Sequence, residues 1–222
     1  PMFLEGLNAR YIPNIPLAMS RLEKEEKDQV KVFTMDFASH DVLQRVLKGT
    51  YDIVFHLAAN PRVEYSVENP TLTTEVNLYK TVALMECAAK SSVKRFVFSS
   101  TCAVYGDATT LPILENAEIS PNSPYGLQKY SVERFAQLLS KTHGLDSICL
   151  RYFNVYGPRQ LGGSPYSTAI TAWTHNAFHN MPLRSDGDGT QTRDLVYVGD
   201  VVRANVLAAK SSKTFAGNCV NI

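Results

Sequence analysis

The chain has 222 residues, and its 22 lysines and arginines nearly balance 21 aspartates and glutamates, which gives a formal net charge of +1. Apolar residues make up 45% and charged residues 19%, a composition typical of a globular protein of one domain or slightly more. The near-neutral charge gives no reason to expect a nucleic acid or an anionic membrane as a partner. No apolar run reaches the roughly 18–20 residues that a membrane-spanning helix requires.

Apolar periodicity begins at residue 30, after a segment with prolines and a charged run at 21–27 that we expect in a solvated helix end or a loop. Beyond it, short apolar runs alternate with segments of helical spacing. Ser123 and Pro124 are typical of the N-cap and first turn of a helix. The predicted strands are 30–35, 51–58, 93–99 and 147–153, and the predicted helices are 41–47, 72–90 and 125–142.

Strands that are apolar throughout and alternate with helices predict an α/β fold with a doubly wound parallel sheet of the Rossmann-like type. We assign this sheet to a domain of residues 1–157. After Gly157 the rhythm changes to glycines, a helix near 167–179 and a polar turn at 186–189. Residues 158–222 therefore predict a smaller C-terminal lobe and a strand that returns to the sheet.

The cysteines predict a reducing, cytoplasmic environment. Cys87, Cys102, Cys149 and Cys219 are widely spaced and form no C-x-x-C pair, so we expect neither a zinc site nor a disulfide framework. Their apolar neighbours indicate small core residues.

Polar or small residues follow the predicted strands, where ligands bind in open α/β sheets. These are Asp36, residues 56–60, residues 99–101 and Asn154. Tyr125 and Lys129 are four residues apart at the start of a helix, so they share one face. An ammonium group beside a phenol lowers the phenol pKa toward that of a useful general base. We therefore expect Tyr125 and Lys129 to act with a hydroxyl of Thr101 or Ser100.

Three motifs carry a family resemblance: SSTCAVYG at 99–106, SPYGLQK at 123–129 and LRYFNVYGPR at 150–159. In this order they resemble the extended short-chain dehydrogenase/reductase superfamily, in its NAD-dependent epimerase/dehydratase family. Within it, the chain is similar to the nucleotide-sugar epimerase branch, UDP-hexose 4-epimerases in particular. The resemblance extends over about residues 30–222.

The resemblance implies an enzyme that uses NAD. Tyr125 would be the catalytic base, Lys129 would hold the nicotinamide ribose and lower the Tyr125 pKa, and Thr101 would bridge the sugar 4-oxygen. The domain of residues 1–157 would bind the cofactor. Besides Tyr125 and Lys129, the residues implied in NAD binding are Asp36, Phe37, Leu57, Ala58, Ala59, Asn77, Ser99, Ser100, Tyr152 and Phe153.

The implied reaction is 4-epimerisation of a UDP-hexose or a UDP-N-acetylhexosamine through a transient 4-keto intermediate. Asn154 and Arg193 would bind the diphosphate of this UDP-sugar, and Thr101 would contact its sugar. Arg is suited to that role because its planar guanidinium matches two phosphate oxygens. The residues 162–166 and Ala172-Trp173 resemble the N-acetylhexosamine type.

Two other functions stay open. One is a UDP-glucuronate epimerase or decarboxylase, and the other is an NAD-binding family member without catalysis. A 4,6-dehydratase is disfavoured, because Cys102 and Ala103 stand where those relatives have an Asp-Glu pair. We also expect a homodimer through the helices near 72–90 and 125–142, as in this family.

The family's G-x-x-G-x-x-G phosphate-binding run is absent from the sequence. The chain also starts at Pro1 and ends at Ile222 within a strand-like run. We therefore expect the first strand-helix unit and part of the sugar-binding lobe to lie outside this sequence.

The remaining histidines and acidic residues predict no metal site. His56 lies within a predicted strand and is expected as a packed core residue. His175 and His179 are one helical turn apart without a third ligand, and the acidic turn at 186–189 lacks the terminal Glu of a calcium loop.

Overall fold

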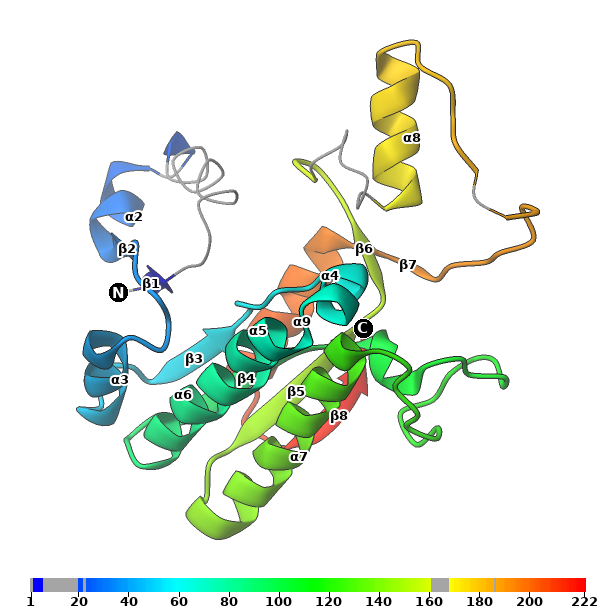
Figure 1. The fold of residues 1–222 in the computed structure, drawn as a ribbon. Helices are drawn as coiled ribbons and strands as arrows, with labels where there is room; N and C mark the ends of the chain where they lie inside the picture. The colour runs from blue at the N-terminus through cyan, green and yellow to red at the C-terminus, as the bar shows by residue number, and fades with distance from the viewer. Residues whose placement is uncertain (1, 6–19, 22, 161–167, 186) are drawn as a thin grey trace.

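The computed structural model describes residues 2–5, 20–21, 23–160, 168–185 and 187–222, and it has an α/β fold built around a parallel sheet (Figure 1). The sheet has the strand order β3-β4-β5-β8, and every neighbouring pair is parallel. Its strands are β3 (Ile53–His56), β4 (Arg95–Thr101), β5 (Ser147–Tyr152) and β8 (Asn218–Asn221). The sheet is parallel because each chain reversal passes through a helix, which confirms the predicted α/β class.

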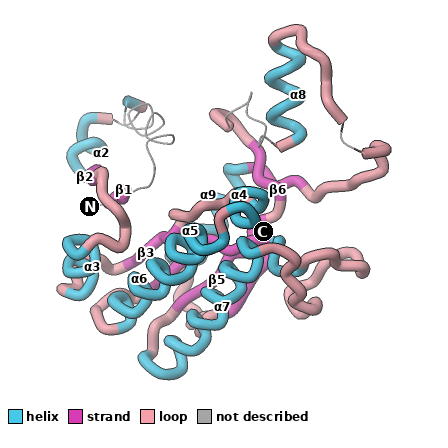
Figure 2. The backbone as a smooth tube through the Cα atoms, viewed as in Figure 1, coloured by secondary structure: helices cyan, strands magenta, loops and turns pink. Residues whose placement is uncertain are grey.

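Helices pack on both faces of this sheet, as a doubly wound fold requires (Figure 2). On one face lie α3 (His40–Leu47), α6 (Lys80–Ala89) and α7 (Pro124–His143). On the other face α9 (Val198–Lys210) packs against β4 and β5. Short helices α4 (Val63–Glu68) and α5 (Pro70–Thr74) precede a π-helical turn η1 (Glu75–Tyr79), and a 3₁₀ turn η2 (Cys102–Tyr105) follows β4.

Two further strand pairs accompany the main sheet. β1 (Met2–Glu5) pairs in parallel with β2 (Val30–Phe33), and α2 (Lys24–Gln29) precedes β2. β6 (Asn154–Tyr156) pairs in parallel with β7 (Leu195–Tyr197), and α8 (Ala169–Phe178) lies between them in sequence. None of the described helices combines the length and the apolar character needed to cross a membrane.

The predicted strands and helices are confirmed with shifted ends. The strands predicted at 51–58 and 93–99 are β3 and β4, and β4 extends to Thr101. The helix predicted at 72–90 is interrupted by η1, which apolar spacing does not reveal. The charged run at 21–27 enters α2, which begins with a capping box between Glu23 and Glu26. Neither α9 nor the β6-β7 pair was predicted.

The two faces of the sheet bury separate apolar clusters. Phe96 and Phe98 of β4 point to the α6-α7 face, and Val97 points to the α9 face. The larger cluster on the α6-α7 face includes Met85, Val132 and Ala136. Because side chains alternate along β4, this strand packs against helices on both faces of the sheet. This packing fixes the position of its last three residues.

An ion pair joins the amino ends of β4 and β5. Arg95 contacts Asp146 at 2.8 Å and donates to the carbonyls of Ala208 and Ser211 at 2.5 and 3.2 Å. This arginine therefore binds the carbonyls at the end of α9, where a cation stabilises a helix. The amino end of the sheet is thus anchored independently of its carboxyl end.

We predict that Phe96→Ala lowers the free energy of unfolding by about 3–5 kcal/mol, because it removes a fully buried ring from the core. Urea denaturation measures this change. Phe178→Ala is the matched control, because this ring is 83% exposed and its loss should change stability by less than about 0.5 kcal/mol. Equal losses in the two variants would contradict the core described here.

Candidate active site

The first turn of α7 is held by two serine side chains. Ser123 is the N-cap, as predicted, and its hydroxyl accepts a hydrogen bond from the Gly126 amide at 3.1 Å. Ser66 of α4, which is fully buried, accepts from the Tyr125 amide at 3.1 Å. Two amides that a helix leaves without internal partners are therefore satisfied, and the backbone of Tyr125 is fixed.

Gly126 allows α7 to lie directly against the turn that follows β4. A Cβ atom at this position would come within 2.6 Å of the Ala103 carbonyl oxygen and 3.1 Å of Pro121. Any side chain here would push the helix away from η2. The glycine thus brings the Tyr125 side chain to the end of β4.

The structure brings Tyr125, Lys129 and Thr101 together, as the sequence predicted. The Thr101 side chain is close enough to Tyr125 to lower the pKa of its phenol, and Lys129 Nζ donates to the Ser99 carbonyl at 2.8 Å. Nζ lies 4.6 Å from the ring centroid of Phe98 and 5.9 Å from that of Tyr125. The phenol and the ammonium thus share the carboxyl end of β4, where open α/β sheets bind ligands.

Burial dominates the electrostatics of this group. Desolvation raises the pKa of Tyr125 to about 12, opposed by the hydrogen bond from Thr101. Desolvation also lowers the pKa of Lys129 to about 7. Lys129 is not among the groups that act on the Tyr125 pKa in this arrangement, so the expectation that Lys129 lowers this pKa stays a prediction. Its ammonium is desolvated, is only partly charged near neutral pH, and donates to a carbonyl rather than to the phenol.

Serine side chains on β4 point to different partners because they alternate across the sheet. Ser99 donates to the Tyr152 hydroxyl at 3.2 Å, and Asn205 of α9 donates to the same hydroxyl at 2.7 Å. Ser100 donates to Glu133 at 2.5 Å on the α7 face. The Ser100 hydroxyl is thus already bonded, and a cofactor contact of Ser99 or Ser100 stays a prediction.

The sequence interpretation missed Glu133 and Arg151, which form a buried ion pair below the Tyr125 group. Arg151 donates from Nε and NH2 to the two carboxylate oxygens of Glu133 at 2.9 and 2.7 Å. The side chains are 5% and 1% exposed. The only sequence signal was a charged residue within the apolar strand 147–153, which was not interpreted.

The predicted cofactor residues after β3 lie at its carboxyl end, in the loop that carries Leu57, Ala58 and Ala59. Asn77 of η1 holds this loop, because its amide accepts from Asn60 N at 2.6 Å and donates to Asn60 O at 3.0 Å. Asn77 also donates to Gln128 of α7 at 2.8 Å. Both amide hydrogens of Asn77 are used in these bonds, so its observed role is to position the loop, and its cofactor contact stays a prediction.

Asp36 and Phe37 follow β2 with different environments. The Asp36 carboxylate forms an ion pair with Lys80 at 2.6 Å. Although desolvation opposes ionisation, the bond from Lys80 holds the pKa of Asp36 below its usual value. The Phe37 ring is buried in the core, 4.7 Å from the ring of His56. Only the backbone of Phe37 is thus available for the predicted cofactor contact.

The β6-β7 pair collects the predicted substrate residues. Asn154 donates from its side chain to the Asp194 carbonyl at 2.9 Å, next to the exposed Arg193. Burial raises the pKa of the Cys102 thiol, and the charge of Arg193 opposes this shift. Arg193 therefore lies near the residue that follows Thr101. Phe153, between β5 and β6, bonds to the Ile222 carbonyl through its amide at 3.1 Å.

His56 is a core residue, as predicted. Its Nε2 is 2.9 Å from Thr81 Oγ1, and desolvation lowers its pKa to about 3. A histidine that stays neutral throughout the physiological pH range supplies packing and one hydrogen bond rather than acid-base chemistry.

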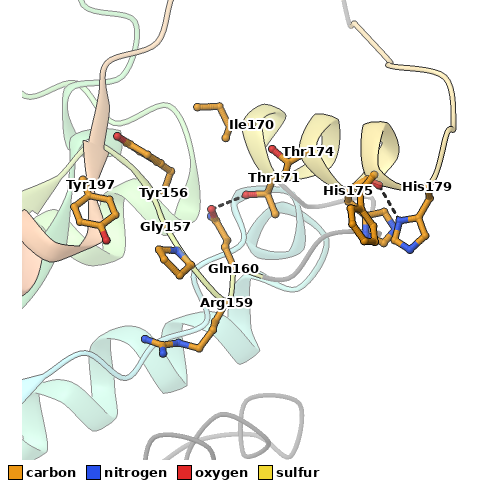
Figure 3. Close-up of a pocket in the computed structure, with 12 residues that line it drawn as sticks. Tyr156, Gly157, Arg159, Gln160, Ile170, Thr171, Thr174, His175, His179 and Tyr197 are labelled. Atoms are coloured by element: carbon orange, nitrogen blue, oxygen red, sulfur yellow. Dashed lines mark hydrogen bonds between the residues drawn. The ribbon is translucent and has the colours of Figure 1, made fainter. Parts of the chain in front are cut away.

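A separate open pocket of about 530 Å³ lies between α8 and the segment after β6 (Figure 3). Thr171 donates to Gln160 at 2.5 Å across it, and His179 Nδ1 is 2.8 Å from the His175 carbonyl. None of the predicted site residues lines this pocket. Within the described part of the chain, no cluster of three metal-binding side chains occurs, so the histidine pair has no third ligand.

Comparisons with known proteins identify the family of the chain. The model of the NAD dependent epimerase/dehydratase family matches residues 13–222. The UDP-glucose 4-epimerase of Mycolicibacterium smegmatis is 32% identical over 187 residues, which cover 83% of this chain and 59% of that protein.

Two solved structures have the same fold. The UDP-N-acetylglucosamine 4-epimerase of Methanobrevibacter ruminantium, in complex with UDP-N-acetylmuramic acid, has a TM-score of 0.84 and 34% identity, and the match covers 92% of this chain and 64% of that one. The UDP-glucuronic acid 4-epimerase of Bacillus cereus, with UDP-glucuronic acid and NAD, has a TM-score of 0.82 and 29% identity over 96% and 65% of the chains. The chain thus spans less than two thirds of the length of these relatives.

The residues at the end of β4 fit the ribose of NAD. A lysine ammonium has three hydrogens, and one of them is bonded to the Ser99 carbonyl. No described carboxylate lies within ion-pair distance of Lys129, so its burial is costly without further acceptors. A pair of ribose hydroxyls would supply them.

The buried Lys129 predicts a distinct pH dependence of stability. Its pKa rises from about 7 in the folded protein to an ordinary value of 10.5 in the unfolded chain, which therefore binds the proton more readily. Stability should thus increase as the pH rises from 7 toward 10. We expect the free energy of unfolding of the wild type, relative to Lys129→Met, to increase by about 1.4 kcal/mol per pH unit in this window.

Urea denaturation at a series of pH values measures this difference. Lys48→Met is the control for removing a lysine from the surface, because Lys48 is exposed and its loss should change stability by less than about 0.5 kcal/mol. A flat difference between wild type and Lys129→Met from pH 7 to 10 would contradict the buried state of Lys129.

Proposed function

This chain belongs to the NAD dependent epimerase/dehydratase family, and we propose that it catalyses the 4-epimerisation of a UDP-sugar with NAD as cofactor. The observation that carries the proposal is the joining of Tyr125, Lys129 and Thr101 at the carboxyl end of β4. The UDP-sugar 4-epimerases among its relatives support the substrate class.

In this reaction Tyr125 takes the proton from the sugar 4-hydroxyl as the C4–H bond breaks, which gives a 4-keto sugar. Bound NAD supplies the hydride acceptor and later the hydride donor at C4. Tyr125 returns the proton to O4 after the sugar has turned its other face. Because burial favours the neutral phenol, Tyr125 needs a cationic neighbour to act as a base, and a charged Lys129 favours the phenolate.

In this proposal the other predicted site residues bind either the cofactor or the sugar nucleotide. Residues 1–157 form the cofactor side, with Asp36 beside the adenine and the loop at 57–59 along the pyrophosphate. Tyr152 and Ser99 border the nicotinamide, and their hydroxyls are bonded to each other. Residues 158–222 contribute to the sugar-nucleotide side, where Arg193 pairs with the diphosphate.

The identity of the sugar is the open choice within this proposal. UDP-glucose, UDP-N-acetylglucosamine and UDP-glucuronic acid are all represented among the relatives. The exposed Arg193 is suited to an anionic diphosphate in each case. We favour the N-acetylhexosamine on the resemblance of residues 162–166, which lie outside the described residues.

We also propose a homodimer and a reducing, cytoplasmic setting. Large apolar side chains are exposed along α7 and the segment that precedes α6: Leu72, Tyr79, Leu127, Phe135 and Leu138. An exposed apolar surface of this kind favours pairing with a second copy. The free thiols of Cys149 and Cys219 face each other across β5 and β8, which supports a reducing environment.

We predict that Tyr125→Phe lowers kcat about 10²–10⁴-fold, because it removes the group that exchanges the O4 proton. The assay separates the 4-epimers formed from UDP-glucose, UDP-N-acetylglucosamine and UDP-glucuronic acid, and records carbon dioxide release from the last. Tyr130→Phe on the same helix is the control and should retain activity. Tightly bound NAD without any 4-epimer would instead identify a non-catalytic family member.

The dimer proposal predicts that Leu127→Glu with Leu138→Glu converts the protein to monomers, because charge is placed on the exposed face of α7. Analytical ultracentrifugation measures the mass of each variant. Leu207→Glu, at an equally exposed position on α9, should leave the mass unchanged. A monomeric wild type would overturn the proposal.

A further inference from the structure

Three residues of one α7 face contact three consecutive residues of β4. Tyr125, Lys129 and Glu133 are spaced by four residues, so they form a row along the helix. Tyr125 lies near Thr101, which acts on its pKa, while Lys129 bonds to the Ser99 carbonyl and Glu133 to the Ser100 hydroxyl. These contacts fix the position of the helix along the strand. Ser100, the partner of Glu133, lies between Ser99 and Thr101, which are next to Lys129 and Tyr125.

Arg151 fixes the Glu133 carboxylate and joins it to the rest of the sheet. Its register partner on β4 is Ser100, so the arginine and the serine hold the carboxylate from adjacent strands. From NH1, Arg151 donates to the Tyr105 hydroxyl at 2.7 Å and the Glu115 carbonyl at 3.2 Å. The Tyr105 hydroxyl donates to Asn221 of β8 at 2.7 Å. One hydrogen-bond network thereby joins α7, β4, β5, η2 and β8.

The charge of Glu133 acts on Lys129, which lies one helical turn away. Desolvation lowers the Lys129 pKa, and Cys149 and Glu133 are the groups that oppose this shift. The other titratable groups that face Lys129 are Tyr125 on α7 and His56 on β3. The pKa of His56 is lowered to about 3, so its ring is neutral at physiological pH and does not repel the Lys129 ammonium. Glu133 is the carboxylate that supports the charged form of Lys129.

We propose that Glu133 and Arg151 are positioning residues for the reaction: their buried ion pair fixes the register of α7 on β4, and the Glu133 carboxylate favours the charged form of Lys129 beside Tyr125. This inference rests on the proposed function for its catalytic meaning. The structure offers a direct comparison, because Arg95 and Asp146 form a second, largely buried ion pair between the amino ends of the same strands. That pair does not contact the Tyr125 group.

The test compares Glu133→Gln with Asp146→Asn in the purified chain. Lysine labelled with ¹³C at Cε gives the titration of Lys129 by nuclear magnetic resonance, and thermal unfolding gives the stability. We expect Glu133→Gln to lower the Lys129 pKa by about 1 unit or more, since a nearby carboxylate is removed. Asp146→Asn should lower stability and leave the Lys129 titration unchanged.

A second variant covers the case in which Glu133→Gln does not fold because Arg151 is left buried without its partner. The double variant Glu133→Gln with Arg151→Met removes both charges. It should still lower the Lys129 pKa, because Arg151 is not among the groups that act on Lys129. A Lys129 titration equal to that of the wild type in the folded variant would overturn the proposal and leave a purely structural ion pair.

Ser100→Ala tests the register separately from the charge, because it leaves the ion pair intact. We expect kcat to fall about tenfold with KM within twofold of the wild type, as for a positioning defect. Unchanged kcat would overturn the register part of the proposal. The titration needs no turnover, so a chain with the expected Lys129 shift and no epimerase activity would overturn the proposed function alone.

Discussion

The packing of α7 against the carboxyl end of β4 is the contact on which the site depends. It requires Gly126, because a Cβ atom there would meet the Ala103 carbonyl at 2.6 Å. It also requires Ser123 and Ser66, whose hydroxyls accept from amides of the first helical turn. Backbone approach and capping thus act on the first turn of the helix, side-chain register acts on its first three turns, and each limits the position of Tyr125.

Burying Lys129 and the Glu133–Arg151 ion pair in this contact costs free energy, and the bonding of these groups explains how far that cost is offset. A lysine ammonium and an ion pair removed from water are unfavourable unless they are hydrogen-bonded and paired. Glu133 and Arg151 satisfy each other through two bonds, whereas Lys129 has one carbonyl acceptor. The incomplete bonding of Lys129 is understandable in a site that holds a hydroxyl-rich ligand. Stability and ligand binding therefore have opposite requirements at this residue.

The near-neutral net charge gives the protein no global field that would attract an anionic nucleotide. Any attraction must be local, and Arg193 next to the β6-β7 pair is the exposed cation near Thr101 and Cys102 that the sequence had singled out. Asn154 binds the backbone at Asp194 and so joins this segment to the end of β5. The β6-β7 pair is thus connected to the sheet by short-range hydrogen bonds.

Local patterns were sufficient to predict much of the fold and part of the site. Apolar runs identified the strands of the main sheet, and Ser123 with Pro124 located the start of α7, because capping chemistry is local. The π-helical turn η1 was not predictable, since its residues keep an ordinary helical composition. The helix α9 was also missed, although it packs against β4 and β5 on one face of the sheet.

The sequence by itself determined which residues could perform the chemistry, because the spacing of Tyr125 and Lys129 and the order of the motifs are properties of the chain. Only the tertiary structure decided their electrostatic state. Desolvation depends on the elements that surround a side chain, and it makes Tyr125 a weaker acid and Lys129 a weaker base than the local pattern implied. The pairing of Glu133 with Arg151 joins residues from a helix and a strand, and no local pattern in the chain encodes such a contact.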